Sequence, residues 1–180
     1  MSLIKVNDIQ TTGGVSNRGK ILQVVSTLKT DTYAYSGTGW QNVTGMSATI
    51  TPVSTSSRVI IQISLGAVGN GDSGAPTLHS TIFRITRGGT TLSSVGDAAS
   101  NRAQCHFRTS TGYNGDHTHA YHFTVVDSPA STSSLTYQLQ GWSQDNNVWY
   151  LNRSRVDDNT ANIVFGGRSS SSIILYEVAG

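Results

Sequence analysis

The amino-acid sequence predicts an all-β protein, an antiparallel β-sandwich of jelly-roll-like topology. Serine and threonine together make up roughly a quarter of the chain, far above their ordinary share. Side chains that favour exposed helices are scarce, with one Glu and three Lys, whereas Thr, Val, Ile and Tyr are plentiful. Short apolar runs are separated by turn signals about every ten residues, which is typical of sandwiches and barrels.

Length and composition favour one domain. A chain of 180 residues suffices for one sizeable β core, and two domains would each have a small one. Residues 1–18 turn polar after Ile9 and are broken by Gly13-Gly14, so we expect an N-terminal arm for attachment. Residues 19–180 should then form a single β-sandwich domain. The first ten residues lack the continuous apolar core of a secretory signal, which predicts synthesis in a cytoplasm.

Charge and cysteine content exclude several classes of function. The net charge of +2 and the absence of a basic stripe give no support to nucleic-acid binding. No apolar run is long enough to span a membrane, so membrane insertion is not expected. The single cysteine, Cys105, excludes a disulfide framework and is interpreted as a packed small hydrophobe.

The expected strands follow from alternation between turn residues. Val59, Ile61, Ile63 and Leu65 share one face of a strand at 58–65, and Arg87-Gly88-Gly89 predicts a hairpin turn. A Gly-rich loop is expected at 66–76, and a turn at Ser36–Gly39 precedes Trp40. The predicted strands lie at 20–28, 46–51, 58–65, 78–86, 90–95, 135–142, 148–152, 161–165 and 172–178.

Two of these strands are apolar on both faces. Ile173 to Tyr176 has no polar alternation, and the first strand, 20–28, also carries apolar residues on both faces. An antiparallel sandwich strand normally has one wet face. The pattern therefore predicts that the outer face of these strands meets another subunit.

Residues 103–126 contain four of the five histidines and a predicted hairpin. Asn114-Gly115 is the strongest two-residue hairpin signal in the chain, because both residues tolerate the positive φ of a type I′ turn. Such a turn would pair 106–110 with 119–123. One face would then carry His106, Arg108, His117, His119, Tyr121 and Phe123. The other face, with Cys105, Phe107, Ala120, His122 and Val126, is predicted to be core.

The imidazole-rich face has two interpretations. His117 and His119 are two residues apart on a strand, a spacing at which neutral imidazoles bind one transition-metal ion. His106 or Asp116 could add a third ligand, or a threefold axis could supply six nitrogens for iron or nickel. Alternatively, His106, Arg108 and the histidine pair form a subunit interface or an exposed recognition surface, with the imidazoles hydrogen-bonded to neighbours.

A second candidate surface surrounds the turn Asp145-Asn146-Asn147. Trp142, Trp149 and Tyr150 flank this turn, and aromatic rings beside polar turn residues are how many lectin-like sites bind sugars. The competing interpretation is that at least one of the tryptophans packs in the core.

Two short motifs resemble those of enzymes, but the sequence around each one does not fit the enzyme class. The pattern Gly69-x-Gly71-x-x-Gly74 resembles a dinucleotide-binding loop, but Pro76 and a strand-like run follow where a helix is required. The segment around Ser73 resembles a serine-protease nucleophile, but the first histidine, His79, comes after the serine rather than before it. We therefore expect a protein that is not an enzyme.

The order of several strand segments resembles a known group of proteins. The segments are 4–14, 19–25, 49–52 with 56–61, 148–154 and 173–180. Together they resemble small tail-fibre-like structural proteins of tailed bacteriophages, many from phages of aquatic bacteria. The resemblance implies a virion component, a homotrimeric fibre or knob. It also implies that a threefold axis could hold iron between His117 and His119 of three chains.

From the residues and the resemblance together we expect a receptor-binding adhesin of a bacteriophage virion. Its partners would be two further copies of itself, other virion proteins through residues 1–18, and a host surface glycan. A head-decoration or tail-accessory protein without receptor binding is the alternative. A glycan-degrading enzyme is a weaker one, because glycosidases use two carboxyls at a defined separation and this chain has few acids.

Overall fold

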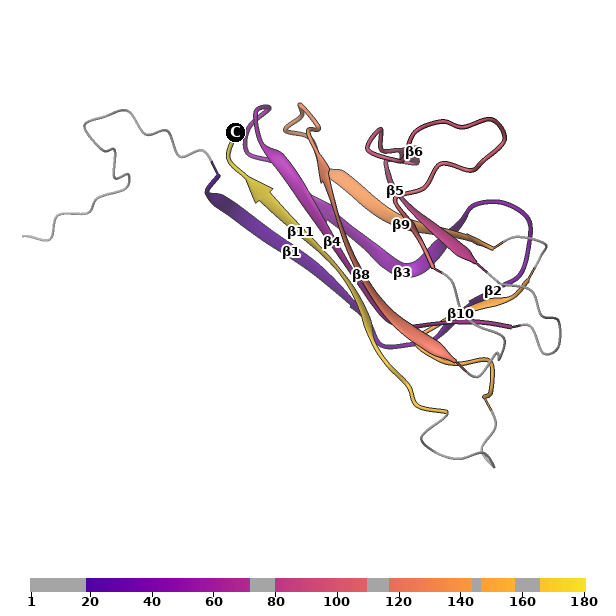
Figure 1. The fold of residues 1–180 in the computed structure, drawn as a ribbon. Helices are drawn as coiled ribbons and strands as arrows, with labels where there is room; N and C mark the ends of the chain where they lie inside the picture. The colour runs from indigo at the N-terminus through magenta and orange to yellow at the C-terminus, as the bar shows by residue number, and fades with distance from the viewer. Residues whose placement is uncertain (1–18, 72–79, 110–116, 144–146, 158–165) are drawn as a thin grey trace, which may run out of the picture.

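In the computed structural model the chain forms two antiparallel β-sheets packed face to face (Figure 1). The structure describes residues 19–71, 80–109, 117–143, 147–157 and 166–180. Sheet A contains β1 (Ile21–Lys29), β2 (Tyr33–Tyr35), β4 (Arg58–Asn70), β8 (Thr118–Asp127), β10 (Trp149–Leu151) and β11 (Ser171–Val178). Sheet B contains β3 (Gln41–Ile50), β5 (Thr81–Arg87), β6 (Thr90–Thr91), β7 (Phe107–Arg108) and β9 (Leu135–Ser143).

The prediction of an all-β, antiparallel fold is confirmed. Within these ranges no helix is long and apolar enough to cross a bilayer. The predicted arm at 1–18 and the predicted strand at 161–165 lie outside the described residues.

Strand β4 is the central element of sheet A. Its first half pairs with β11, its end pairs with β10, and β8 runs along its opposite edge. The strand continues through 66–70, so the prediction of a loop over this part was wrong. Gly66 does not form a turn. It allows the backbone of Ser170 to approach β4 closely, because a Cβ at this position would lie 2.2 Å from the Ser170 carbonyl oxygen.

Sheet B is built around the hairpin of β5 and β6 and the pairing of β5 with β9. The predicted turn at Gly88-Gly89 is confirmed, since Arg87 pairs with Thr90. Both glycines have positive φ, 55° and 86°, as a two-residue type I′ turn requires. β3 pairs with the other edge of β9.

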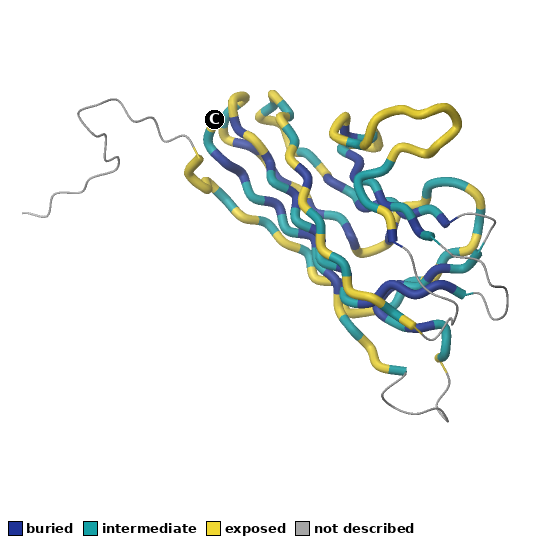
Figure 2. The backbone as a smooth tube through the Cα atoms, in the orientation of Figure 1, coloured by how far each residue is buried: buried dark blue, intermediate teal, exposed yellow. Residues whose placement is uncertain are grey.

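The core lies between the sheets and follows the alternation of the strands (Figure 2). Trp149 of β10 is fully buried and contacts the Phe83 ring of β5 edge-on at 5.3 Å. Gly141 of β9 makes room for the indole, because a Cβ at this position would lie 2.5 Å from it. The predicted recognition role of Trp149 was therefore wrong, and the core interpretation holds for this tryptophan.

The predicted histidine hairpin does not form. β7 pairs with β5 in sheet B, whereas β8 pairs with β4 in sheet A, so the two strands face each other across the sandwich. Phe107 stacks on Phe123 at 5.1 Å and contacts Tyr121 at 5.3 Å. Apolar alternation on each strand marks the inner face but carries no information on which sheet the strand joins. The residues of the predicted turn, Asn114-Gly115, lie outside the described residues.

A carboxylate ties the two sheets together at the end of β8. Asp127 accepts hydrogen bonds from the guanidinium of Arg87 on β5 and, at 2.7 Å, from the hydroxyl of Tyr137 on β9. Desolvation raises the pKa of the Tyr137 hydroxyl above its usual value, and the bond to Asp127 raises it further. The tyrosine thus stays a neutral donor inside the core.

The one glutamate, Glu177, is buried on β11. It lies on the other side of β4 from Asp127, since both residues pair with Val59. It accepts hydrogen bonds from Gln23 of β1 at 2.6 Å and from the Val53 amide at 2.8 Å. Desolvation acts to raise the pKa of this carboxyl, but the hydrogen bonds donated to it outweigh that effect and hold the pKa below its usual value. The carboxylate fastens the turn after β3 to β1 and β11.

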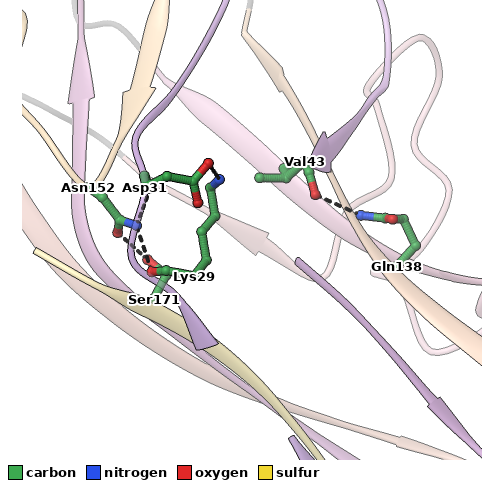
Figure 3. A network of polar contacts seen from close by, with 6 residues as sticks. All are labelled: Lys29, Asp31, Val43, Gln138, Asn152 and Ser171. Atoms are coloured by element: carbon green, nitrogen blue, oxygen red, sulfur yellow. Dashed lines mark hydrogen bonds and ion pairs between the residues drawn. The ribbon is translucent and has the colours of Figure 1, made fainter. Parts of the chain in front are cut away.

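Asn152 joins three segments of sheet A where β10 ends (Figure 3). Its side-chain amide donates to the carbonyl oxygens of Lys29 and Asp31 at 3.0 and 2.9 Å, and its oxygen accepts from the Ser171 hydroxyl at 2.6 Å. The residue is fully buried and has a φ of 64°. Asparagine tolerates this left-handed conformation better than most residues do.

We expect Asn152→Gly to lower the free energy of unfolding by about 2 kcal/mol, because it removes the hydrogen bonds to the Lys29 and Asp31 carbonyls and to the Ser171 hydroxyl from a buried or partly buried network. Asn152→Ala should cost roughly 1 kcal/mol more, since alanine also adopts the positive φ unwillingly. Urea denaturation measures both values. Asn101→Ala, at an exposed loop position, is the control and should cost under about 0.5 kcal/mol. Equal effects of Asn152→Gly and the control would contradict this account of the network.

Candidate functional site

A pocket opens on the outer face of sheet B, between the start of β3, strand β5 and the segment after β6. Its volume is about 430 Å³, within the usual range for small-ligand sites of roughly 300–1,000 Å³. The lining combines an indole, a guanidinium, hydroxyls and an amide, which suits a polar ligand with apolar ring faces. The described residues that line it are Trp40, Arg84, Thr91, Leu92, Ser93, Val95 and Gln104.

Arg84 is the charged side chain of this pocket. It lies on β5 between Phe83 and Ile85, whose side chains are buried in the core, so alternation directs Arg84 outward. The guanidinium carbon lies 4.2 Å from the centre of the Trp40 ring, and the Nε–H donates to the Gln140 amide oxygen at 2.8 Å. Desolvation lowers the pKa of this guanidinium. The side chain is therefore held in one orientation at the pocket wall.

Polar side chains extend the pocket wall across sheet B. Gln140 of β9 receives the Arg84 hydrogen bond and donates to the Asn42 side chain of β3 at 2.8 Å. Trp142 of β9 is half-buried and contacts Trp40 edge-on at 5.8 Å. Of the predicted sugar-stacking aromatics, Trp142 is therefore beside the pocket.

His106 fastens the segment that closes the pocket, which we term the pocket loop (residues 93–106, the large exposed loop beside β6 in Figures 1 and 2). The backbone N–H of Ile85 donates to its Nδ1 at 3.1 Å, and its Nε2 lies 3.2 Å from the Ser94 hydroxyl. The His106 amide donates to the Phe83 carbonyl at 2.9 Å. Both ring nitrogens are thus used within the chain, so His106 supports the loop rather than forming the predicted recognition surface.

The protonation state of His106 follows from these contacts. Desolvation and the nearby Arg84 lower the pKa of the imidazole to about 4. A neutral ring is also required by the hydrogen bond, because Nδ1 must be unprotonated to accept from Ile85. The histidine is therefore uncharged at physiological pH.

The other predicted histidines lie on or next to β8. His117 and His119 are exposed, and the described residues contain no group of three His, Cys, Asp or Glu side chains that could hold a metal ion. Two imidazoles from one chain do not complete a transition-metal site. The prediction for His122 was wrong: it is exposed and hydrogen-bonds Ser64 at 3.0 Å, because β8 directs Tyr121 and Phe123 inward instead.

The other predicted site residues that the structure describes, Arg108 and Tyr150, are not among the residues that line the pocket. Arg108 of β7 is exposed and donates to the Ser80 hydroxyl at 3.0 and 3.2 Å. Tyr150 of β10 is half-buried, with the Arg153 guanidinium 4.3 Å from its ring centre. Asp145 and Asn146 lie outside the described residues.

The outer face of sheet A carries an apolar patch, defined here by Leu22, Val24, Leu28, Ile60, Ile174, Tyr176 and Val126. Val24, Tyr176, Ile60 and Val126 are paired in register across four adjacent strands. Val24, Leu28 and Val126 are 54%, 65% and 49% exposed. The second apolar face expected for the first and last strands therefore exists, and in the single chain it faces solvent.

Sequence reasoning missed Trp40, Arg84 and Gln104 as site residues. A weak signal was present in the β5 sequence, where Arg84 is the charged residue within the run T-I-F-R-I-T. Trp40 follows a glycine-rich turn and gave no such signal. Their proximity arises from the β-sheet register, since Trp40 directly precedes β3, Arg84 is on β5, and β9 pairs with both strands.

No family model matches the chain, and no curated protein matches it. Among solved structures it is similar to a chain of one titled "Structure of infectious bursal disease virus Gt strain", at 13% sequence identity and a TM-score of 0.38. The match covers 100% of this chain and 43% of the viral chain. A likeness this distant does not indicate a function.

The depressed pKa of His106 makes stability depend on pH. Between about pH 6.5, the ordinary pKa, and about pH 4, the unfolded chain binds a proton at this residue that the folded chain does not. Stability should therefore fall as the pH is lowered through this window. His106→Gln should flatten the dependence measured by urea denaturation at a series of pH values. His122→Gln, at an exposed position, is the control and should retain it. An unchanged slope in His106→Gln would contradict a half-buried, neutral imidazole at this position.

Proposed function

We propose that the protein is a non-enzymatic recognition module that binds a saccharide in the pocket of sheet B. The observation that carries the proposal is the arrangement of Trp40 and Arg84, an indole and an oriented guanidinium at the wall of one cavity. Sugars combine apolar ring faces with hydroxyl groups, so aromatic rings and fixed polar groups are the side chains that recognise them. Thr91, Ser93 and Gln104 supply such polar groups around the opening.

The scaffold suits this role. Arg84 belongs to a strand whose inward neighbours are fully buried, and the pocket loop is fastened to the same strand by His106. Binding residues on a rigid β scaffold lose little conformational freedom when a ligand binds. The pocket is therefore prepared in the free protein.

The biological setting that we propose is the virion of a tailed bacteriophage, where the module would act as a fibre or knob that attaches to a host surface glycan. The support is the resemblance of the strand segments to tail-fibre-like proteins. Residues 1–18 would then connect the module to other virion proteins. A decoration or tail-accessory protein is the competing proposal, and it predicts assembly without saccharide binding.

The apolar patch of sheet A supports assembly into a homotrimer with jelly-roll-like subunits. Four apolar side chains in register across adjacent strands form a continuous surface that burial would stabilise. In such a trimer His117 and His119 of three chains could supply six nitrogens to iron or nickel. The metal site therefore depends on the trimer and is the less supported of the two proposals.

Trp40→Ala should weaken saccharide binding about tenfold or more, because a central aromatic side chain in a pocket contributes a large share of the affinity. A glycan array followed by titration calorimetry measures the change. Tyr150→Ala is the matched control, since this aromatic lies outside the pocket. Recovered saccharides should be unchanged in mass, as expected without hydrolysis. Loss of binding in Tyr150→Ala with retention in Trp40→Ala would move the site to the predicted turn at 145–147.

The parent protein should have three times the 19.1 kDa mass of one chain in sedimentation experiments. The double substitution Val24→Asp with Val126→Asp should give monomers, because it buries carboxylates within the subunit contact. Thr44→Asp on the exposed face of β3 adds charge to the other sheet and should leave the trimer intact. A monomeric parent would contradict the trimer and, with it, the shared metal site.

A further inference from the structure

The pocket contains a guanidinium whose hydrogen-bonding edge has no carboxylate partner in the described part of the chain. The Nε–H of Arg84 is used by Gln140, and the stack on Trp40 holds the plane of the group. Its two terminal nitrogens make no hydrogen bond or ion pair to any described residue. We propose that these nitrogens bind a carboxylate of the ligand, so that the saccharide is acidic. This inference rests on the proposed function and specifies its substrate class.

Arg153 differs from Arg84 in having a carboxylate partner within the chain. Arg153 also lies against an aromatic ring, that of Tyr150 at 4.3 Å, but it forms an ion pair with Asp157 at 3.0 Å. Arg87 is likewise paired, with Asp127. Arg84 has the same aromatic support as Arg153 and no internal counter-ion among the described residues. A carboxylate of the proposed ligand would supply that charge.

The local electrostatics favour an anion over a neutral sugar. Arg84 is the one charged side chain among the described lining residues. His106, which accepts from the Ile85 amide next to Arg84 on β5, is neutral, and the amide groups of Gln140 and Gln104 carry no charge. A partly desolvated guanidinium gains more from an ionised partner than from a hydroxyl, because charge-assisted hydrogen bonds are the stronger ones.

The geometry of the group selects a planar anion. A guanidinium presents parallel N–H bonds that match the two oxygens of a carboxylate, and its orientation here is fixed before binding. Uronic acids and sialic acids both carry such a group next to a sugar ring. The shared chemistry is a carboxylate within bonding distance of a ring whose apolar face meets the indole.

The experiment compares acidic saccharides with neutral counterparts of the same size. Trigalacturonic acid and sialyllactose are titrated into the parent protein by calorimetry, each beside its own methyl ester. We expect at least one acid to bind about tenfold or more tightly than its neutral counterpart, and the preference to weaken as salt is raised. The preferred acid distinguishes uronic from sialic acids.

Two substitutions assign the preference to Arg84. Arg84→Gln should remove the difference in affinity between the acid and neutral forms. Arg84→Lys should keep only part of it, because an ammonium group does not present the parallel N–H bonds of a guanidinium. Arg153→Gln is the matched control and should bind like the parent. Circular dichroism confirms folding of each variant, and the parent's own acid-to-ester comparison stands even if one variant fails to fold.

The possible failures are distinguishable. Equal affinity of the parent for acidic and neutral forms would overturn the inference and leave saccharide binding in place. An acid preference that survives in Arg84→Gln, or is lost equally in Arg153→Gln, would also overturn it. Absence of binding to every saccharide on the array would overturn the proposed function itself.

Discussion

The contact between Phe83 and Trp149 determines how the rest of the molecule is arranged. It brings sheet B and sheet A together across the core, with the indole seated in the space that Gly141 leaves. Because Phe83 must point inward, alternation places Arg84 outward, and the same register aligns β5 with Gln140 on β9. A slip of one residue would bury the guanidinium and expose the phenyl ring. The core therefore positions the candidate site.

The pocket loop depends on the same strand through His106. Its imidazole accepts the Ile85 N–H at the edge of β5, where β6 and β7 leave this amide without a strand partner, and its amide donates to Phe83. An imidazole that serves as an acceptor must be neutral, and its desolvated position keeps it so. Among the described lining residues of the pocket, Arg84 is the charged one. The position of the pocket loop and the neutrality of His106 thus have a common physical origin.

Alternation and turn chemistry predicted most strands, the Gly88-Gly89 hairpin and the second apolar face of sheet A. They failed where the outcome depends on which strands pair. The predicted hairpin joined β7 to β8, although these strands belong to opposite sheets, and the error reversed the expected environments of His106 and His122. Trp149 and Trp142 lie in similar sequence surroundings, and only the sheet register separates the buried indole from the one beside the pocket. Trp40 and Arg84 meet through β9, a contact between distant segments that no local pattern encodes.

We propose that a saccharide occupies the pocket at Trp40 and Arg84. The chain has three tryptophans, and their environments differ: Trp40 lines the pocket, Trp142 contacts Trp40, and Trp149 is buried between the sheets. A titration followed by nitrogen–proton correlation NMR resolves the indole N–H signal of each one and the Arg84 Nε–H signal. Saturating acidic saccharide should shift the Trp40 and Arg84 signals most, the Trp142 signal less, and leave that of Trp149 in place. Unshifted Trp40 and Arg84 signals under conditions of demonstrated binding would contradict the account.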